Sequence, residues 1–191
     1  MIRFAPLLAT AALALAAPAS AATVIPVAHF NALELHGGGE VTLKYGPVQR
    51  VTLIAGDTKY SVIEVKNGRL EVTPCRSWWD CPRQYDFKVE IVTPSLSAVS
   101  VHGGGELASE GKFPVQHTLA LSVHGGGDVD LRSMPAETVS AEVHGGGDLQ
   151  TSVSQSLSAS VYGGGDLTYW GHPAQLAVAT HGGGSINRGG E

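Results

Sequence analysis

The sequence lacks the features that mark several common classes of protein. No segment has the 3.6-residue apolar periodicity of an amphipathic helix, so little helix is expected. Charged residues make up only 15% of the 191 residues, and Lys and Arg number 12 against 17 Asp and Glu. Nucleic-acid binding needs a basic patch, so this acidic balance argues against a nucleic-acid partner. Beyond residue 17 there is no long apolar run, so stable membrane insertion is not expected.

The single apolar run lies at the start of the chain. It follows Arg3, is rich in Ala and Leu, and ends at the small residues Ala19-Ser20-Ala21. This is the pattern of a secretory signal peptide cleaved near Ala21. The run is shorter than the ~20 residues that a membrane span needs. We therefore predict a signal peptide over residues 1–21, a single mature domain over residues 22–191, and a periplasmic or secreted location.

Cysteine is also scarce, with only Cys75 and Cys81 in the chain. In an exported protein, an isolated pair predicts a disulfide. The short loop that this bond would close contains Trp78 and Trp79. The two rings either cover the end of the core or form an exposed platform for a sugar or a partner protein. Trp78 and Trp79 are therefore the candidate partner-binding residues.

Glycine, in contrast, is abundant, and much of it lies in six copies of one motif. The first copy reads His36-Gly37-Gly38-Gly39-Glu40, and later copies begin at His102, His124, His144, Tyr162 and His181. From the second copy on, the motifs start 22, 20, 18 and 19 residues apart. A period near 20 is typical of a solenoid, in which each repeat forms one coil stacked on the last.

The residues between the motifs indicate β-strands. Apolar residues alternate with polar ones after each motif and again before the next one, as at Val129 and Leu131 and then at Val139, Ala141 and Val143. Each coil is therefore expected to hold two short strands joined by a polar loop, with the strands of successive coils parallel. Residues 24–99 read instead as strands with hairpin turns, and Asn67-Gly68 is the clearest turn signal.

The order of these elements resembles a known family. Phe30 to Leu35, the Asn67-Gly68-Arg69-Leu70 hairpin, Val89 to Leu96 and the series of Gly-Gly-Asp-apolar turns are similar to the putative auto-transporter adhesin head GIN domains. The resemblance covers nearly the whole mature chain and implies an all-β, right-handed parallel β-helix-like fold. It also implies adhesion or surface binding, and it supplies no catalytic residues.

The glycine motif has several interpretations. Three glycines between strands allow a tight corner with positive φ and a close approach of the next coil, so the central Gly146 is expected to tolerate no β-branched side chain. A lipase-type oxyanion loop would need a Gly-x-Ser-x-Gly nucleophile, which the chain lacks. A calcium-binding nonapeptide solenoid would need half this period. The structural-turn glycines predicted here are Gly103, Gly104, Gly105, Gly125, Gly126, Gly127, Gly145, Gly146 and Gly147.

The first and last residues of the motif are expected to form two exposed columns. Equivalent positions of stacked coils lie about one strand spacing apart, near 4.8 Å. Histidine favours zinc, nickel or copper, whereas carboxylates alone favour calcium. The candidate metal ligands are His102, His124 and His144, with Glu106, Asp128 and Asp148 as co-ligands or as a separate calcium site. The alternative is that backbone N–H groups at the corners neutralise the carboxylates.

The sequence therefore predicts an exported, non-enzymatic binding or structural protein, with a surface glycan or a protein as its partner and no certain cofactor. The competing class is an extracellular enzyme that acts on polysaccharides, because β-helices often carry such chemistry on one face. An Arg or Lys beside a cluster of carboxylates would favour the enzyme. A divalent-metal-binding His and Asp ladder is the third alternative.

Overall fold

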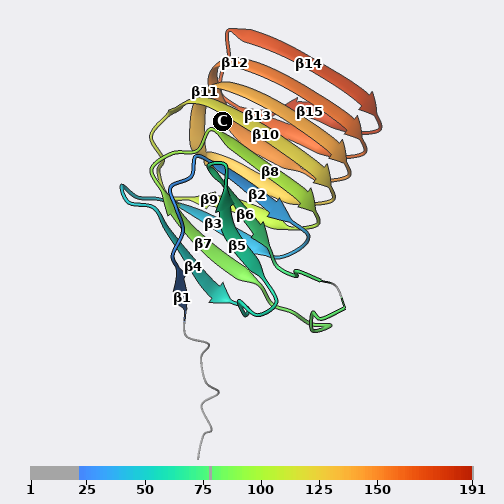
Figure 1. Cartoon of the computed structure of the whole chain (residues 1–191). Helices are drawn as coiled ribbons and strands as arrows, with labels where there is room; N and C mark the ends of the chain where they lie inside the picture. Colours follow the sequence, from blue (N-terminus) through green and yellow to red (C-terminus); the bar gives the residue numbers. More distant parts are fainter. Residues whose placement is uncertain (1–21, 78, 191) are drawn as a thin grey trace, which may run out of the picture.

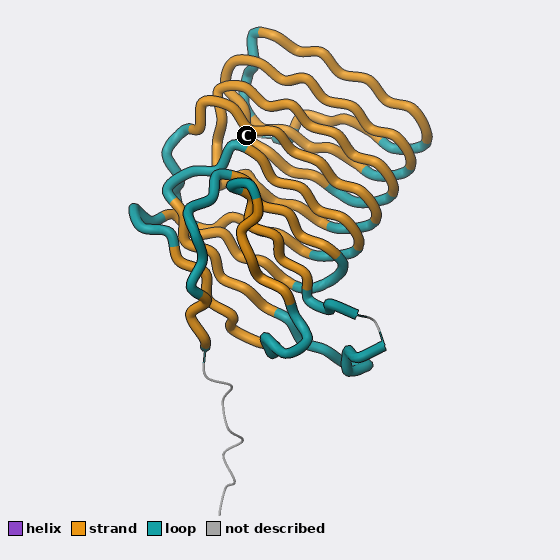
Figure 2. Tube along the Cα trace, in the orientation of Figure 1, coloured by secondary structure: helices purple, strands orange, loops and turns teal. Residues whose placement is uncertain are grey.

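The computed structural model describes residues 22–77 and 79–190, so the predicted signal peptide and Trp78 lie outside the described residues. Over that part of the chain the protein is all-β, with fifteen strands in one sheet (Figure 2). The expected all-β class is confirmed. None of the described residues belongs to a helix that is long and apolar enough to cross a membrane.

The N-terminal part holds seven strands and contains all the antiparallel pairs of the described sheet. β1 pairs with β4, β4 pairs with β7, and β5 pairs with β6. The predicted hairpin between β5 and β6 is present, and both turn residues have positive φ, 51° at Asn67 and 76° at Gly68. The bounds are β1 Thr23–Ile25, β2 Ala32–His36, β3 Glu40–Tyr45, β4 Arg50–Ala55, β5 Val62–Lys66, β6 Arg69–Thr73 and β7 Lys88–Thr93.

The remaining strands form regular coils that stack on this base, as Figure 1 shows. The strand that precedes each glycine motif and the strand that follows it belong to two different parallel stacks. The bounds are β8 Ala98–Gly103, β9 Glu106–Glu110, β10 Gln116–Gly125, β11 Asp128–Gly145, β12 Leu149–Gly163, β13 Asp166–Trp170, β14 Gln175–Gly182 and β15 Ser185–Arg188.

We call the two parallel stacks the histidine stack and the carboxylate stack. In the histidine stack the order is β6, β2, β8, β10, the end of β11, the end of β12, and β14. In the carboxylate stack the order is β7, β3, β9, the start of β11, the start of β12, β13 and β15. Successive coils therefore lie in parallel register on both sides of one core.

Two of the coils differ from the expected pair of short strands. β11 and β12 are continuous strands of 18 and 15 residues that run through both stacks. The corner opposite the glycines is made by a shift of register between Leu131 and Ala136, so that the strand bends without breaking. Backbone pairing with the adjacent coil is interrupted after Leu131 and resumes at Ala136, so the stretch predicted to be a loop lies within one extended strand.

The core lies between the two stacks and is built from the alternating apolar residues. Val101, Val123, Val143 and Val161 occupy one column and are all buried. Leu107, Val129, Leu149 and Leu167 form a buried column in the carboxylate stack. The alternation of burial along β6 to β13 confirms the period-two prediction and leaves every second side chain on an outer face.

The glycine corner brings successive backbones into contact, and its three positions have different requirements. The amides of Gly146 and Gly147 both donate to the carbonyl oxygen of Gly125 on the preceding coil, at 2.9 and 3.0 Å. Gly145 has φ +127°, and a Cβ there would lie 2.3 Å from that same oxygen. A Cβ on Gly147 would lie 2.3 Å from the Gly127 oxygen.

The middle glycine is different, and the prediction for Gly146 was wrong. A Cβ on this residue would meet nothing within 4 Å, and its φ is not in the positive region. The middle glycines Gly104 and Gly126 are equally open. From the second motif on, the first and third glycines are therefore the ones that the corner requires, because only at these two positions would a Cβ meet the preceding coil.

These contacts predict a clear difference between neighbouring glycines. Gly145→Ala should lower the free energy of unfolding by about 2 kcal/mol or more, because it combines positive φ with a backbone clash. Gly146→Ala should change it by no more than about 0.5 kcal/mol, as expected for an exposed position. Urea unfolding of both variants measures the difference, and equal midpoints would contradict this account of the corner.

Candidate functional site

Six aromatic rings form one continuous column along the outside of the histidine stack. His36, His102, His124, His144, Tyr162 and His181 follow one another, each from the next coil. Their successive ring centroids lie 5.2, 5.0, 4.8, 4.7 and 4.9 Å apart, and the ring planes differ by only 4–14°. The predicted column of His102, His124 and His144, with Tyr162 and His181 above them, is present, and His36 extends it by one ring at the other end.

The spacing of the rings follows from the backbone beneath them. Paired strands lie about 4.7–4.9 Å apart, which is close to the separation of stacked rings. Because the motif places its first residue at the same register position in every coil, each ring stacks on the last. The ring faces are covered by neighbouring rings, and the ring edges point outward. The side chains of His36, His102 and His144 are 38–41% exposed.

Next to the ring column, the outer surface of the histidine stack is made mostly of small side chains. We call this surface, together with the ring column, the ladder face. Two columns of aligned residues run beside the rings. In the six strands that carry the rings, Glu34 and Glu142 are the only charged members of these columns, whereas β6 adds Glu71 beside Glu34 and Arg69 beside Ala32. The nearer column is Glu34, Ser100, Ser122, Glu142, Ser160 and Ala179, and the farther one is Ala32, Ala98, Ala120, Ser140, Ser158 and Ala177.

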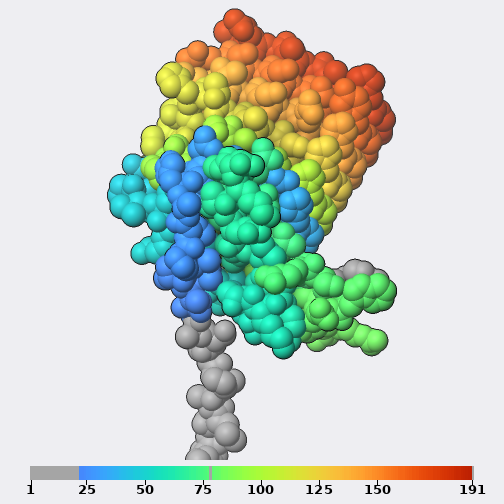
Figure 3. All heavy atoms as spheres, viewed as in Figure 1, coloured from blue at the N-terminus to red at the C-terminus, as the bar shows by residue number. Residues whose placement is uncertain are grey.

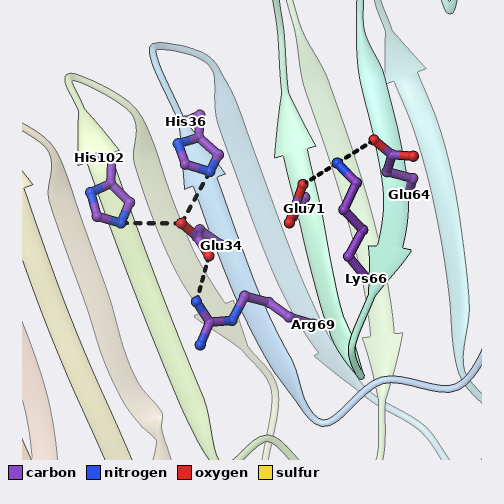
Figure 4. Close-up of polar contacts among 7 residues, drawn as sticks. All are labelled: Glu34, His36, Glu64, Lys66, Arg69, Glu71 and His102. Atoms are coloured by element: carbon purple, nitrogen blue, oxygen red, sulfur yellow. Dashed lines mark hydrogen bonds and ion pairs between the residues drawn. The ribbon is translucent and has the colours of Figure 1, made fainter.

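Glu34 connects the first two rings to a cation on the neighbouring strand (Figure 4). Its Oε1 lies 3.1 Å from His36 Nε2 and 3.4 Å from His102 Nε2, and its Oε2 accepts from Arg69 at 2.6 Å. Nearby on the β5–β6 hairpin, Lys66 lies between Glu64 and Glu71. No local pattern in the sequence predicts the contact between Glu34 and Arg69, because the contact depends on the pairing of β2 with β6 across 35 residues.

The pKa values of this cluster are shifted. Burial lowers the pKa of His102, and the neighbouring His124, His36 and Arg69 lower it further, against the attraction of Glu34. Burial alone would raise the pKa of Glu34, but the hydrogen bond and charge of Arg69, followed by the charges of His36 and His102, lower this pKa overall. The folded state therefore favours an ionised Glu34 and a neutral His102.

The carboxylates form a second column, which lies outside the carboxylate stack. Glu106 and Asp128 are paired in register, and the pairing of Val129 with Leu149 places Asp148 next to them. The three line an open depression of about 300 Å³ together with Asp130 and Gln150. The amide of Asp166 donates to Asp148 Oδ1 at 3.2 Å, so at this position the predicted neutralisation by a backbone N–H is present.

The structure does not bring the histidine and carboxylate columns together. They lie in different stacks on either side of the glycine corner, and no three His, Cys, Asp or Glu within residues 22–77 and 79–190 are grouped as a metal site. One zinc ion shared by two rings needs nitrogens no more than about 4.2 Å apart, twice the usual Zn–N distance. The rings lie 4.7–5.2 Å apart, so adjacent rings would have to tilt to share an ion.

The cysteine loop projects from the N-terminal part of the fold. Cys75 and Cys81 are joined by a disulfide, as predicted. Trp79 is 75% exposed, which places its ring outside the core. For Trp79 the core-covering alternative is therefore wrong, whereas Trp78 lies outside the described residues.

Comparison with known proteins agrees with this architecture. The family described as "Putative auto-transporter adhesin, head GIN domain" matches residues 29–131 and again residues 115–173. The chain belongs to the head GIN domain family. No curated protein matches the sequence.

Solved structures of the same kind resemble the chain in fold. The chain is similar to a putative adhesin from Bacteroides fragilis, with a TM-score of 0.55 and 18% identity over 88% of this chain and 96% of that one. A putative adhesin from Parabacteroides distasonis has a TM-score of 0.45 and 16% identity, over 88% and 96% of the two chains. At 18% identity, the likeness to the Bacteroides fragilis protein shows a shared fold alone and does not assign a ligand.

The shifted pKa values predict acid sensitivity in two steps. Because folding lowers the pKa of His102, the contribution of this residue to stability is fully present above pH 6.5, the pKa of an unfolded histidine. This contribution is lost as the pH falls through the lower pKa of the folded state. Folding also lowers the pKa of Glu34, so the stability that its ionised carboxylate contributes is lost as the pH falls below 4.5, the pKa of an unfolded glutamate. Melting followed by circular dichroism should show a fall in melting temperature below about pH 6.5 that is smaller in His102→Gln. His29→Gln, which changes a histidine outside the ring column, is the control. An equal fall in melting temperature in the wild type, His102→Gln and His29→Gln would contradict the assignment of this acid sensitivity to His102.

The metal hypothesis gives a second prediction. If the ladder binds zinc, nickel or copper, titration calorimetry of the chelator-treated protein should give heat that is lost in His124→Ala. If the carboxylate column binds calcium, the heat should instead be lost in Asp128→Asn. No heat with any of these ions, and no shift in melting temperature, would overturn the hypothesis for both columns.

Proposed function

We propose that this chain is an exported, non-enzymatic binding protein that contacts a surface glycan through the ladder face. The family gives the context, because its members are described as putative adhesins. The observation that carries the proposal is the row of stacked rings, whose edges are repeated once per coil along an exposed surface. An extended polymer with repeating polar groups suits such a row.

The chemistry of the ring edges favours hydroxyl-rich or anionic sugars. Each neutral imidazole offers one N–H donor and one acceptor nitrogen, and Tyr162 offers a hydroxyl. The ring faces are covered by their neighbours, so stacking of a sugar on an aromatic face is available only at the ends of the column. The small Ser and Ala side chains beside the rings leave room for a chain to lie along the surface.

The competing enzyme would act at the carboxylate depression. Asp130 lines this depression, and Arg132 donates to both carboxylate oxygens of Asp130, so a cation stands beside the carboxylates, which is the combination named above. Glycoside hydrolysis by two carboxyl groups needs one of them to be an acid with a raised pKa. Burial would raise the pKa of Asp130, but its hydrogen bonds with Arg132 lower it overall. Asp130 is therefore not suited to be the acid of such a pair.

Two further parts of the proposal concern the fold and the location. The parallel return of each coil to the same stack supports a right-handed β-helix, because parallel crossovers are right-handed in the great majority of proteins. The adhesin relatives and the signal-like N-terminus support a periplasmic or secreted location.

A glycan array tests the proposed function. The mature protein should bind one or more polysaccharides, and the double variant His124→Ala, His144→Ala should lose at least about tenfold in affinity, a loss near 1.4 kcal/mol. These two rings lie in the middle of the ladder, so their removal interrupts the longest continuous row. Glu106→Gln with Asp128→Asn on the carboxylate stack is the matched control and should bind normally.

The same assays distinguish binding through the ladder face from binding through the cysteine loop and from catalysis in the carboxylate depression. Loss of binding in Trp79→Ala, with the ladder double variant unchanged, would move the site to the cysteine loop. Shortened polysaccharide products that disappear with Asp128→Asn would assign catalysis to the depression. Either result would overturn the proposal for the ladder face.

A further inference from the structure

The two ends of the coil stack differ in how they are closed. At the N-terminal end, antiparallel strands and the cysteine loop surround the first coils, as Figures 1 and 3 show. At the other end, β14 pairs with β12, β15 pairs with β13, and no further strand of the described chain follows them. The last coil therefore has no cap among the described residues.

The inward-facing side chains of the last coil are exposed as a result. Leu176 is aligned with the buried Leu157, and Val178 is aligned with the buried Ala159. Leu176 is 50% exposed and Val178 is 48% exposed, whereas their two partners are at most 2% exposed. Leu176 and Val178 are therefore core-facing residues that no further coil of the described chain covers.

The edge of β14 also lacks the usual protection against pairing. Natural edge strands are interrupted by charges, prolines or bulges that prevent association. β14 runs for eight residues, Gln175–Gly182, without Lys, Arg, Asp, Glu or Pro and without a register shift against β12. An uncharged, regular edge of this length beside an open core is suited to adding another strand.

We infer that two copies of the chain associate through this end, with β14 of one copy beside β14 of the other about a two-fold axis. The pairing is self-complementary, since the edge carries no charge that would be repelled by its own copy. β14 has eight residues and β15 has four, so pairing β14 with its equivalent uses the full edge, whereas pairing it with β15 would leave half of it unpaired.

This arrangement completes the core and extends the ladder face. In the dimer, Leu176 and Val178 of one copy would pack against those of the other copy. The two cores, each open at this end in a single copy, would then form one continuous buried core. The ladder faces of the two copies would lie on the same side of the dimer, because a two-fold axis that makes β14 antiparallel to its own copy keeps each histidine stack next to the other. The glycan-binding surface proposed above would then be doubled in length, although the dimer does not depend on that function.

Sedimentation velocity and light scattering over a range of protein concentrations test the inference. The purified protein should be a dimer that dissociates on dilution, and Val178→Lys should be a monomer with an unchanged far-UV circular dichroism spectrum. Ser158→Lys adds the same charge to the outer surface of the preceding coil and should remain a dimer. Mixing Val178→Lys with Val178→Glu should restore the dimer, because opposite charges then meet across the axis.

Several results would overturn the inference. A wild-type protein that is monomeric at all concentrations would mean that the open end is covered by a different molecule or left exposed. A Val178→Lys variant that still dimerises would place the interface elsewhere. Filaments in place of dimers would indicate head-to-tail association, which a two-fold contact excludes.

Discussion

Direct contact between backbones at the glycine corners is the constraint on which the rest of the structure depends. From the second corner on, amides of one coil donate to a carbonyl oxygen of the coil before it, and a Cβ on the first or third glycine would meet that coil. The contact fixes the register of both stacks at once, since the strand before the corner and the strand after it are held by the same few residues. A one-residue slip at a corner would turn the apolar side chains of both strands outward.

The ring column is a consequence of this register and has its own electrostatic limits. Two unit charges 5 Å apart repel by about 0.8 kcal/mol in water and by about 3 kcal/mol at an effective dielectric of 20. A fully protonated ladder is therefore opposed by every pair of neighbouring histidines, and Glu34 offsets this repulsion only at one end. A bound anionic polymer would offset it along the whole column, so protonation and binding of such a ligand would be coupled.

The carboxylate column shows another way in which a solenoid accommodates a repeated charge. Asp148 accepts a backbone amide of the next coil, and Asp166 accepts both the amide and the hydroxyl of Ser185. The two backbone amides are supplied by the fold and cost no side-chain entropy of the donor. The same motif therefore produces two columns with different characters, aromatic edges on one stack and backbone-bound carboxylates on the other.

The sequence by itself determined the repeat, the all-β class, the disulfide and the alignment of the histidines, because all of these follow from local spacing. It could not distinguish the three glycines of a motif, since only the position of the preceding coil shows that Gly145 and Gly147 touch a carbonyl oxygen while Gly146 faces open space. It could not place Glu34 beside Arg69 or separate the histidines from the carboxylates, because these relations depend on which strands pair and on which side of a corner each residue lies. The open end at β14 was also decided by the tertiary structure. Leu176 and Val178 follow the same alternation as the core residues of earlier coils, and only the absence of a further described coil leaves them exposed.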